Sequence, residues 1–71
     1  MKTDKTFLKE FGIKVQNRRK ELGISQEELA YRAGFHRTYI GMIERAERNI
    51  TLSNLKRLAD ALEIEIKNFF E

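Results

Sequence analysis

Residues 26–45 read QEELAYRAGFHRTYIGMIER, and this stretch decides the fold. Ala30 is small, so a neighbouring helix can cross closely at that point. Gly34 follows three residues after Tyr31 and can supply the positive φ that a tight turn needs. Ile40 and Ile43, three positions apart, give the next helix an apolar anchor. We therefore expect two short helices that meet at a sharp turn.

Such a pair is a helix-turn-helix pattern, in which the second helix enters the DNA major groove. A generic pair of antiparallel helices also favours glycine at its turn, so the spacing alone leaves that alternative open.

Outside this stretch, apolar residues recur at helical spacing, and no stretch alternates as a half-buried strand would. The pattern predicts a compact all-α bundle of five helices, in one domain over residues 1–71 with its core over about 6–70. The five helices run from Thr6 to Leu22, from Ser25 to before Gly34, from near His36 to before a loop at 46–50, from Thr51 through Leu62, and from Ile64 to Phe70.

Two hydroxyl residues mark helix starts. Ser25 can cap the free backbone N–H groups of the second helix, and Glu28, three residues later, completes a capping box. Thr51 caps the fourth helix in the same way. Gly23 is placed to end the first helix.

Composition excludes several classes of protein. The chain has 71 residues and no cysteine, which rules out a disulfide scaffold and a thiolate metal cluster, and its one histidine, His36, cannot build a zinc site alone. We expect no metal and no cofactor. Apolar runs are too short for a membrane span and the start lacks a secretory signal, so a cytoplasmic protein is expected. The net charge of +3 is concentrated in residues 1–24, which suits an anionic partner.

Residues 23–62, GISQEELAYRAGFHRTYIGMIERAERNITLSNLKRLADAL, resemble the Cro-like and phage-repressor-like helix-turn-helix family of bacterial regulators, often called XRE. The resemblance covers roughly residues 8–70 and implies the lambda-repressor-like DNA-binding fold. The stretch HRTYIGMIERAERNITLSNL is most similar to the controller proteins of restriction–modification systems. Ala46 stands where Gly is usual and Ile50 where Pro is common, so the loop at 46–50 is the part least securely carried over.

The resemblance implies that Arg37, Thr38 and Tyr39 read DNA bases from the first turn of the second helix of the motif. Their chemistry suits that task. Arginine binds guanine O6 and N7 with two hydrogen bonds, and the methyl group of threonine suits the methyl group of thymine. Tyr39 offers a ring and a hydroxyl to bases or to phosphate. The alternative is a solvated helix face.

By the same resemblance, the DNA phosphates are bound by Gln26, Arg48 and Asn49, and His36, at a position where a capping serine is usual, is added as a candidate for a phosphate or groove-edge contact. Gln26 starts a helix, and helix N-termini bind anions. The alternatives are that Gln26 and His36 only start their helices and that Arg48 is only solvated. Weaker candidates for these contacts are Arg45, Ser53 and Asn54.

One further expected role is structural. In related regulators an arginine late in the first helix pairs with a glutamate late in the DNA-reading helix, which here implies a pair of Arg19 with Glu44. Arg18, which precedes Arg19, is expected to face solvent.

The chain end is more apolar than so small a core requires, which favours a dimer interface there. The residues placed in that interface are Ile66, Phe70 and Leu52. Some of these end residues can instead belong to the core, Phe69 first among them.

The expected function is that of a sequence-specific DNA-binding transcription regulator, a homodimer on a palindromic operator, of the controller type. RNA polymerase is a further candidate partner, and the bacterial nucleoid is the expected location. Alternatives are a phage-type repressor, a DNA-binding antitoxin and, from another class, a protein-interaction module that lacks DNA binding. An enzyme is not expected, because no Ser/His/Asp set, carboxylate pair in a cleft, glycine-rich phosphate loop or metal cluster is present.

Overall fold

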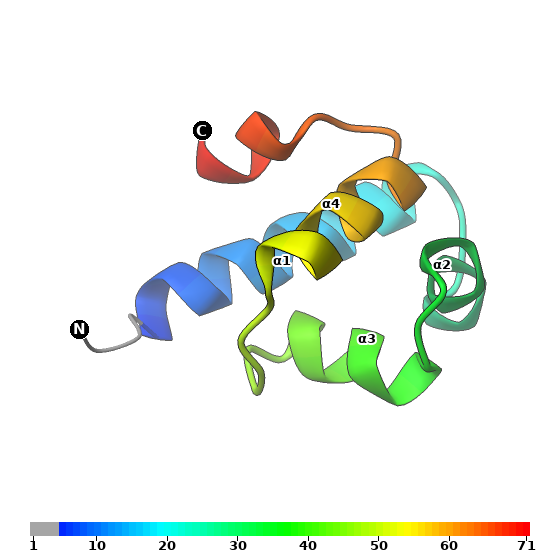
Figure 1. The fold of residues 1–71 in the computed structure, drawn as a ribbon, viewed down its shortest axis with the longest axis horizontal. Coiled ribbons are helices and arrows are strands. Elements are labelled where there is room, and N and C mark those ends of the chain that lie inside the picture. Colours follow the sequence, from blue (N-terminus) through cyan, green and yellow to red (C-terminus); the bar gives the residue numbers. More distant parts are fainter. Residues whose placement is uncertain (1–4) are drawn as a thin grey trace.

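The computed structural model describes residues 5–71, and within that range the regular structure is helical, with no strand (Figure 1). The elements in order are α1 (Lys5–Glu21), α2 (Gln26–Ala33), α3 (Arg37–Glu44), α4 (Leu52–Ala61) and the 3-10 helix η1 (Ile66–Phe70). The all-α prediction is confirmed. No helix within the described range is both long and apolar enough to cross a membrane.

The prediction of five α-helices is wrong at the chain end. Glu63 adopts a left-handed conformation with φ of 58°, which stops α4 at its C-terminus. Glu65 and Asn68 then cap each other's backbone N–H groups and start a new, shorter turn. The five residues Ile66–Phe70 form a 3-10 helix, the tighter helix that proteins use in short segments.

The predicted caps form at α2 and α4. Ser25 Oγ accepts a hydrogen bond from the Glu28 backbone N–H at 2.9 Å, and Thr51 Oγ1 accepts one from the Asn54 N–H at 3.1 Å. In a full capping box the Glu28 carboxylate would also accept from the Ser25 backbone N–H. Here it accepts instead from Arg32 Nε at 2.9 Å. Both starts are therefore set by residues next to them in sequence.

One apolar core joins α1 to α4 and takes in η1. Ile40 and Ile43 are fully buried in it, as their spacing predicts. Phe69 is buried as well and packs edge-on against Phe11 with ring centroids 4.8 Å apart. The alternative that Phe69 belongs to the core is therefore correct. The largest fully buried side chains are Leu29, Ile40, Ile43, Leu58, Leu62 and Val15.

Helix α3 lies along the lower edge of the molecule in Figure 1, with α1 and α4 above it and α2 beside it. Gly12 lets α1 approach the end of α3, because a Cβ there would lie 2.7 Å from the carbonyl oxygens of Ile43 and Glu44. Only glycine allows so close a contact between the two backbones. The scaffold therefore supports one side of α3 and leaves the opposite side open.

Two basic side chains of α1 hold the chain end. Lys14 Nζ donates to the Phe69 carbonyl at 3.1 Å. Arg18 Nε donates to the Leu62 carbonyl at 2.9 Å, at the end of α4. The expectation that Arg18 faces solvent is wrong, because the last carbonyls of a helix lack partners within the helix and attract a cation.

Candidate nucleic-acid interface

The uncovered side of α3 carries the residues expected to read bases. Arg37 and Thr38 are exposed in the first turn of α3. With Gln26 at the start of α2 and Gly41 and Arg45 further along, they line a shallow hollow of about 200 Å³. The structure thus brings the start of α2 and the first half of α3 to one surface, as helix-turn-helix geometry requires.

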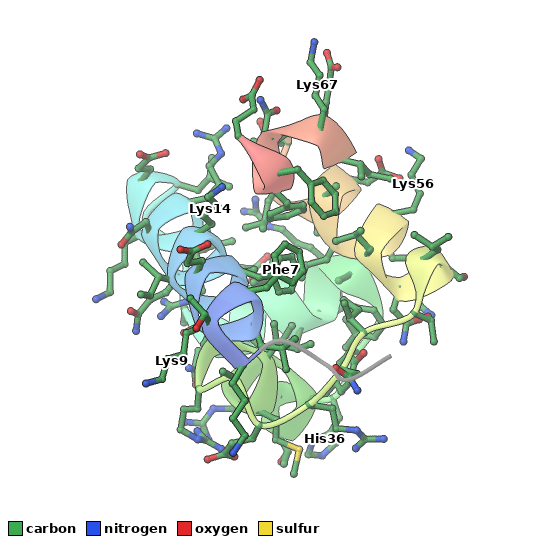
Figure 2. All side chains as sticks on the ribbon, turned by 90° about the vertical axis from the view of Figure 1, so that its left-hand side faces the viewer. Phe7, Lys9, Lys14, His36, Lys56 and Lys67 are labelled. Atoms are coloured by element: carbon green, nitrogen blue, oxygen red, sulfur yellow. The ribbon has the colours of Figure 1, made fainter. Side chains whose placement is uncertain are left out.

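His36 begins α3 as its cap. Its Nδ1 accepts a hydrogen bond from the Thr38 backbone N–H at 3.1 Å, the role that a serine or threonine hydroxyl usually fills. A neutral ring that accepts at Nδ1 carries its proton on Nε2. His36 is exposed and lies at the end of the molecule where α3 lies (Figure 2), so its ring can reach an acceptor outside the protein.

Tyr39 is half-buried, in contrast to the exposed Arg37 and Thr38 before it. Its ring packs edge-on against Phe35 at a centroid distance of 4.9 Å, and its hydroxyl accepts from Asn54 Nδ2 at 3.1 Å. The guanidinium of Arg48 lies over the same ring, 5.7 Å from its centroid. Because a phenol can accept and donate at once, the hydroxyl still has its own proton to give.

Glu44, at the C-terminal end of α3, is the centre of a partly buried network. Arg19 donates to it twice, from Nε at 2.7 Å and from Nη2 at 3.2 Å. Gln26 Nε2 donates to the same carboxylate at 3.0 Å. The Gln26 side chain is therefore tied to Glu44 by one of its N–H groups, and the backbone N–H of Gln26 at the start of α2 is a further candidate for its predicted phosphate contact.

The segment after α3 carries two more predicted phosphate ligands, Arg48 and Asn49, and both are exposed. Before them Arg45 donates two hydrogen bonds, each 3.1 Å, to the Glu47 carboxylate. These bonds from Arg45 lower the pKa of Glu47 and raise that of Arg45. Glu47 thus pairs with Arg45, one of the two arginines that line the hollow.

Ala46 stands where the family usually has glycine, and its backbone conformation is the one that glycine favours. Its φ is 61°, in the left-handed region that favours glycine. The loop therefore adopts, with alanine, the backbone conformation for which glycine is the usual residue, and it bears a strain that glycine would not.

The three residues assigned to the dimer interface differ in exposure. Leu52 is 80% exposed and Phe70 is 58% exposed, whereas Ile66 is half-buried against the core. The ring of Phe7, labelled in Figure 2, stacks on Phe70 with centroids 5.7 Å apart. The sequence did not single out this contribution of α1 to the apolar surface.

Two residues that shape this site are not among those predicted from the sequence. Gly12, within the first helix, sets the approach of α1 to α3. Arg57 of α4 binds the turn between α2 and α3. An isolated glycine in a helical pattern can point to a close contact, but no sequence feature points to the contact of Arg57.

Residues 15–69 match the helix-turn-helix family. Among curated relatives, control protein C.SmaI of Serratia marcescens is 58% identical over 43 residues, which cover 61% of this chain. The matched segment spans about half, 51%, of that relative.

Two solved structures are similar over most of this chain. The restriction–modification controller protein C.AhdI of Aeromonas hydrophila has a TM-score of 0.86 at 43% identity, covering 89% of this chain and 96% of its own. The controller protein C.Esp1396I, solved as a tetramer in complex with its natural 35 base-pair operator, has a TM-score of 0.83 at 38% identity, covering 90% and 84%.

Proposed function

Because this chain belongs to the helix-turn-helix family, we propose that it is a sequence-specific DNA-binding transcription regulator, and that it acts as a homodimer on a palindromic operator. We assign it to the controller proteins of restriction–modification systems. The observation that carries the proposal is the open first turn of α3, in a fold that matches C.Esp1396I, a protein solved on its operator.

Base reading is assigned to Arg37, Thr38 and Tyr39. Arg37 and Thr38 are exposed on the side of α3 that the scaffold leaves open, so they can reach base edges in the major groove. Tyr39 is more restricted, because Phe35 and Asn54 hold it. It can contribute the proton of its hydroxyl or the edge of its ring.

Phosphate binding is assigned to Gln26, His36, Arg48 and Asn49. Gln26 contributes a backbone N–H at the positive end of α2, and His36 its Nε2–H. Arg48 and Asn49 lie on the exposed segment after α3. Contacts of this kind fix the register of a protein on the duplex but do not specify sequence.

Pairing is assigned to the exposed apolar surface of Leu52 and Phe70, with Ile66 at its edge and Phe7 stacked on Phe70. Two-fold pairing places two reading helices on inverted half-sites about 34 Å, one turn of DNA, apart. The symmetry of the dimer then matches a palindromic operator.

The regulator that we propose acts without enzymatic activity, metal or cofactor. We place it on the bacterial chromosome, in the cytoplasm. A regulator bound at a promoter lies near RNA polymerase, which we keep as a candidate partner. A phage-type repressor or an antitoxin would use the same surface and would differ in the genes beside it.

Selection of bound sequences from random DNA tests the proposal. We expect an enriched motif with two inverted half-sites whose centres lie about 10 base pairs apart. Recovery of no motif, from protein shown to be folded, would favour a protein-interaction module and overturn the proposal. Recovery of a motif with a single half-site would support sequence-specific DNA binding but refute the dimer.

A further inference from the structure

Arg57 of α4 binds the turn between α2 and α3 with three contacts. Its Nε donates to the Ala33 carbonyl at 3.1 Å, and its Nη2 donates to the Gly34 carbonyl at 2.6 Å. Its guanidinium lies over the ring of Phe35, 4.4 Å from the centroid. The carbonyls at the end of a helix carry partial negative charge, so a cation that binds two of them stabilises the turn.

Gly34 makes room for this contact. Its φ is 75°, and a Cβ at this position would lie 2.7 Å from Arg57 Nη2. A side chain here would therefore strain the turn and push the guanidinium away. The glycine of the helix-turn-helix pattern thus accommodates a side chain from α4 as well as the bend of the backbone.

The contact continues from the turn into α3. Phe35, under the guanidinium of Arg57, packs against Tyr39 in the first turn of α3. The Tyr39 hydroxyl accepts from Asn54, which precedes Arg57 by three positions and so lies on the same face of α4. One face of α4 therefore holds both the turn and the first turn of the reading helix.

We propose that Arg57 and Asn54 are positioning residues for operator recognition. They orient α3 through Phe35 and Tyr39 and do not themselves contact DNA. This inference rests on the proposed function, because orientation matters only if α3 reads bases. Helix α3 has only eight residues, and hydrogen bonds to base edges weaken steeply as their angles worsen. A small rotation of α3 is therefore expected to reduce selectivity more than total affinity.

The test compares Arg57→Gln and Arg57→Lys with a matched control, Lys56→Gln. Lys56 is the adjacent basic residue, exposed and paired with Asp60. Figure 2 places it far from His36 and the reading surface. The control thus removes the same charge from the same helix without touching the turn. Affinity is measured for the selected operator and for unrelated DNA, each over a range of salt concentrations.

We expect Arg57→Gln to weaken operator binding about tenfold, the equivalent of one misaligned charge-assisted hydrogen bond between α3 and a base. Binding to unrelated DNA should change less than about twofold, and the salt dependence should stay at its wild-type slope, because no phosphate contact is lost. Arg57→Lys should also lose selectivity, since an ammonium group cannot reproduce the planar stack and the two fixed bonds. Lys56→Gln should match wild type.

Two outcomes of the DNA measurements would overturn the inference. One is that Arg57→Gln weakens both DNAs alike and lowers the salt slope by about 0.9, which identifies a phosphate ligand. The other is that Arg57→Gln retains full selectivity, or that Arg57→Lys restores it completely, because charge alone would then account for the effect.

Backbone amide chemical shifts of the free variants provide a readout that needs no DNA. In Arg57→Gln we expect shifts to move at residues 34–40, and in Lys56→Gln to stay unchanged there. Unmoved shifts at 34–40 would refute the inference even if no operator were found, a result that would count separately against the proposed function. If Arg57→Gln fails to fold, Asn54→Leu tests the same link through Tyr39 and should likewise lower selectivity at an unchanged salt slope.

Discussion

Arg19 and Glu44 join α1 to α3 through two hydrogen bonds, Nε to Oε2 at 2.7 Å and Nη2 to Oε1 at 3.2 Å. The pair is largely buried, with 11% of the arginine side chain and 2% of the glutamate side chain exposed. Arg19 also donates from Nη1 to the Ile24 carbonyl, so it ties three parts of the chain together.

Arg19→Ala should lower the free energy of unfolding by about 3–5 kcal/mol, because the buried Glu44 keeps only its bond from Gln26. That is a large share of the roughly 4–10 kcal/mol expected at this length. Urea unfolding measures the change. Lys20→Ala, on the exposed side of the same helix, is the control and should have little effect. If the two variants unfold alike, the ion pair contributes nothing to stability.

The parts of the fold that the sequence predicts are those set by neighbouring residues. Ser25 and Thr51 cap α2 and α4 because a cap needs only a hydroxyl and an N–H three residues later. The expectation of a fifth α-helix was wrong because the backbone turns left-handed at Glu63 and continues from Ile66 as a 3-10 helix. Apolar spacing alone does not reveal where the backbone changes hand.

In the candidate site, too, local features could be predicted from the sequence and contacts between helices could not. The exposed positions of Arg37 and Thr38 follow from the helical pattern, and the resemblance implied the pair of Arg19 with Glu44. The bond of Gln26 to Glu44 and the contact of Arg57 with the turn join residues 18 and 24 positions apart. Such contacts depend on how helices pack, which spacing within one helix does not specify.

Ala46→Gly should stabilise the protein. A left-handed alanine costs about 1–2 kcal/mol, and the greater freedom of glycine in the unfolded chain offsets about 0.4–1 kcal/mol of that. For a domain of this size a gain of about 0.5–1 kcal/mol raises Tm by a few degrees. Ala61→Gly, at a helical position, is the matched control and should lower Tm. A decrease in Tm for Ala46→Gly would show that the loop bears no strain there.

Arg37→Ala and Arg48→Ala should separate base reading from phosphate binding. Loss of Arg37 should cost about 1–3 kcal/mol on the operator and relax the preference at one base position. Loss of Arg48 should weaken all sequences alike and reduce the salt slope by about one. Base preference is measured by repeating the selection from random DNA with each variant. If neither variant changes it, the assignment of Arg37 is wrong.

Two adjacent phenylalanines, Phe69 and Phe70, differ in the exposure of their rings. Phe69 is 2% exposed and belongs to the core, whereas the next ring, Phe70, turns outward and stacks on Phe7. Truncation of Phe69 should therefore cost about 3–5 kcal/mol of fold stability. Truncation of Phe70 removes mostly exposed area and should leave the folded monomer nearly as stable as wild type.

Phe70→Ala and Leu52→Ala should instead weaken the dimer. An aromatic residue at the centre of an interface contributes about 2 kcal/mol or more, so Phe70→Ala should raise the dimer dissociation constant about thirtyfold, and Leu52→Ala, which truncates an aliphatic side chain, should raise it less. Sedimentation equilibrium at several concentrations measures this constant, and thermal unfolding of the same samples excludes a loss of fold. Ile66→Ala should show a mixture of both effects, because Ile66 is half-buried against the core. A wild-type protein that stays monomeric at micromolar concentration would refute this interface, and so would a dimer that tolerates Phe70→Ala and Leu52→Ala without change.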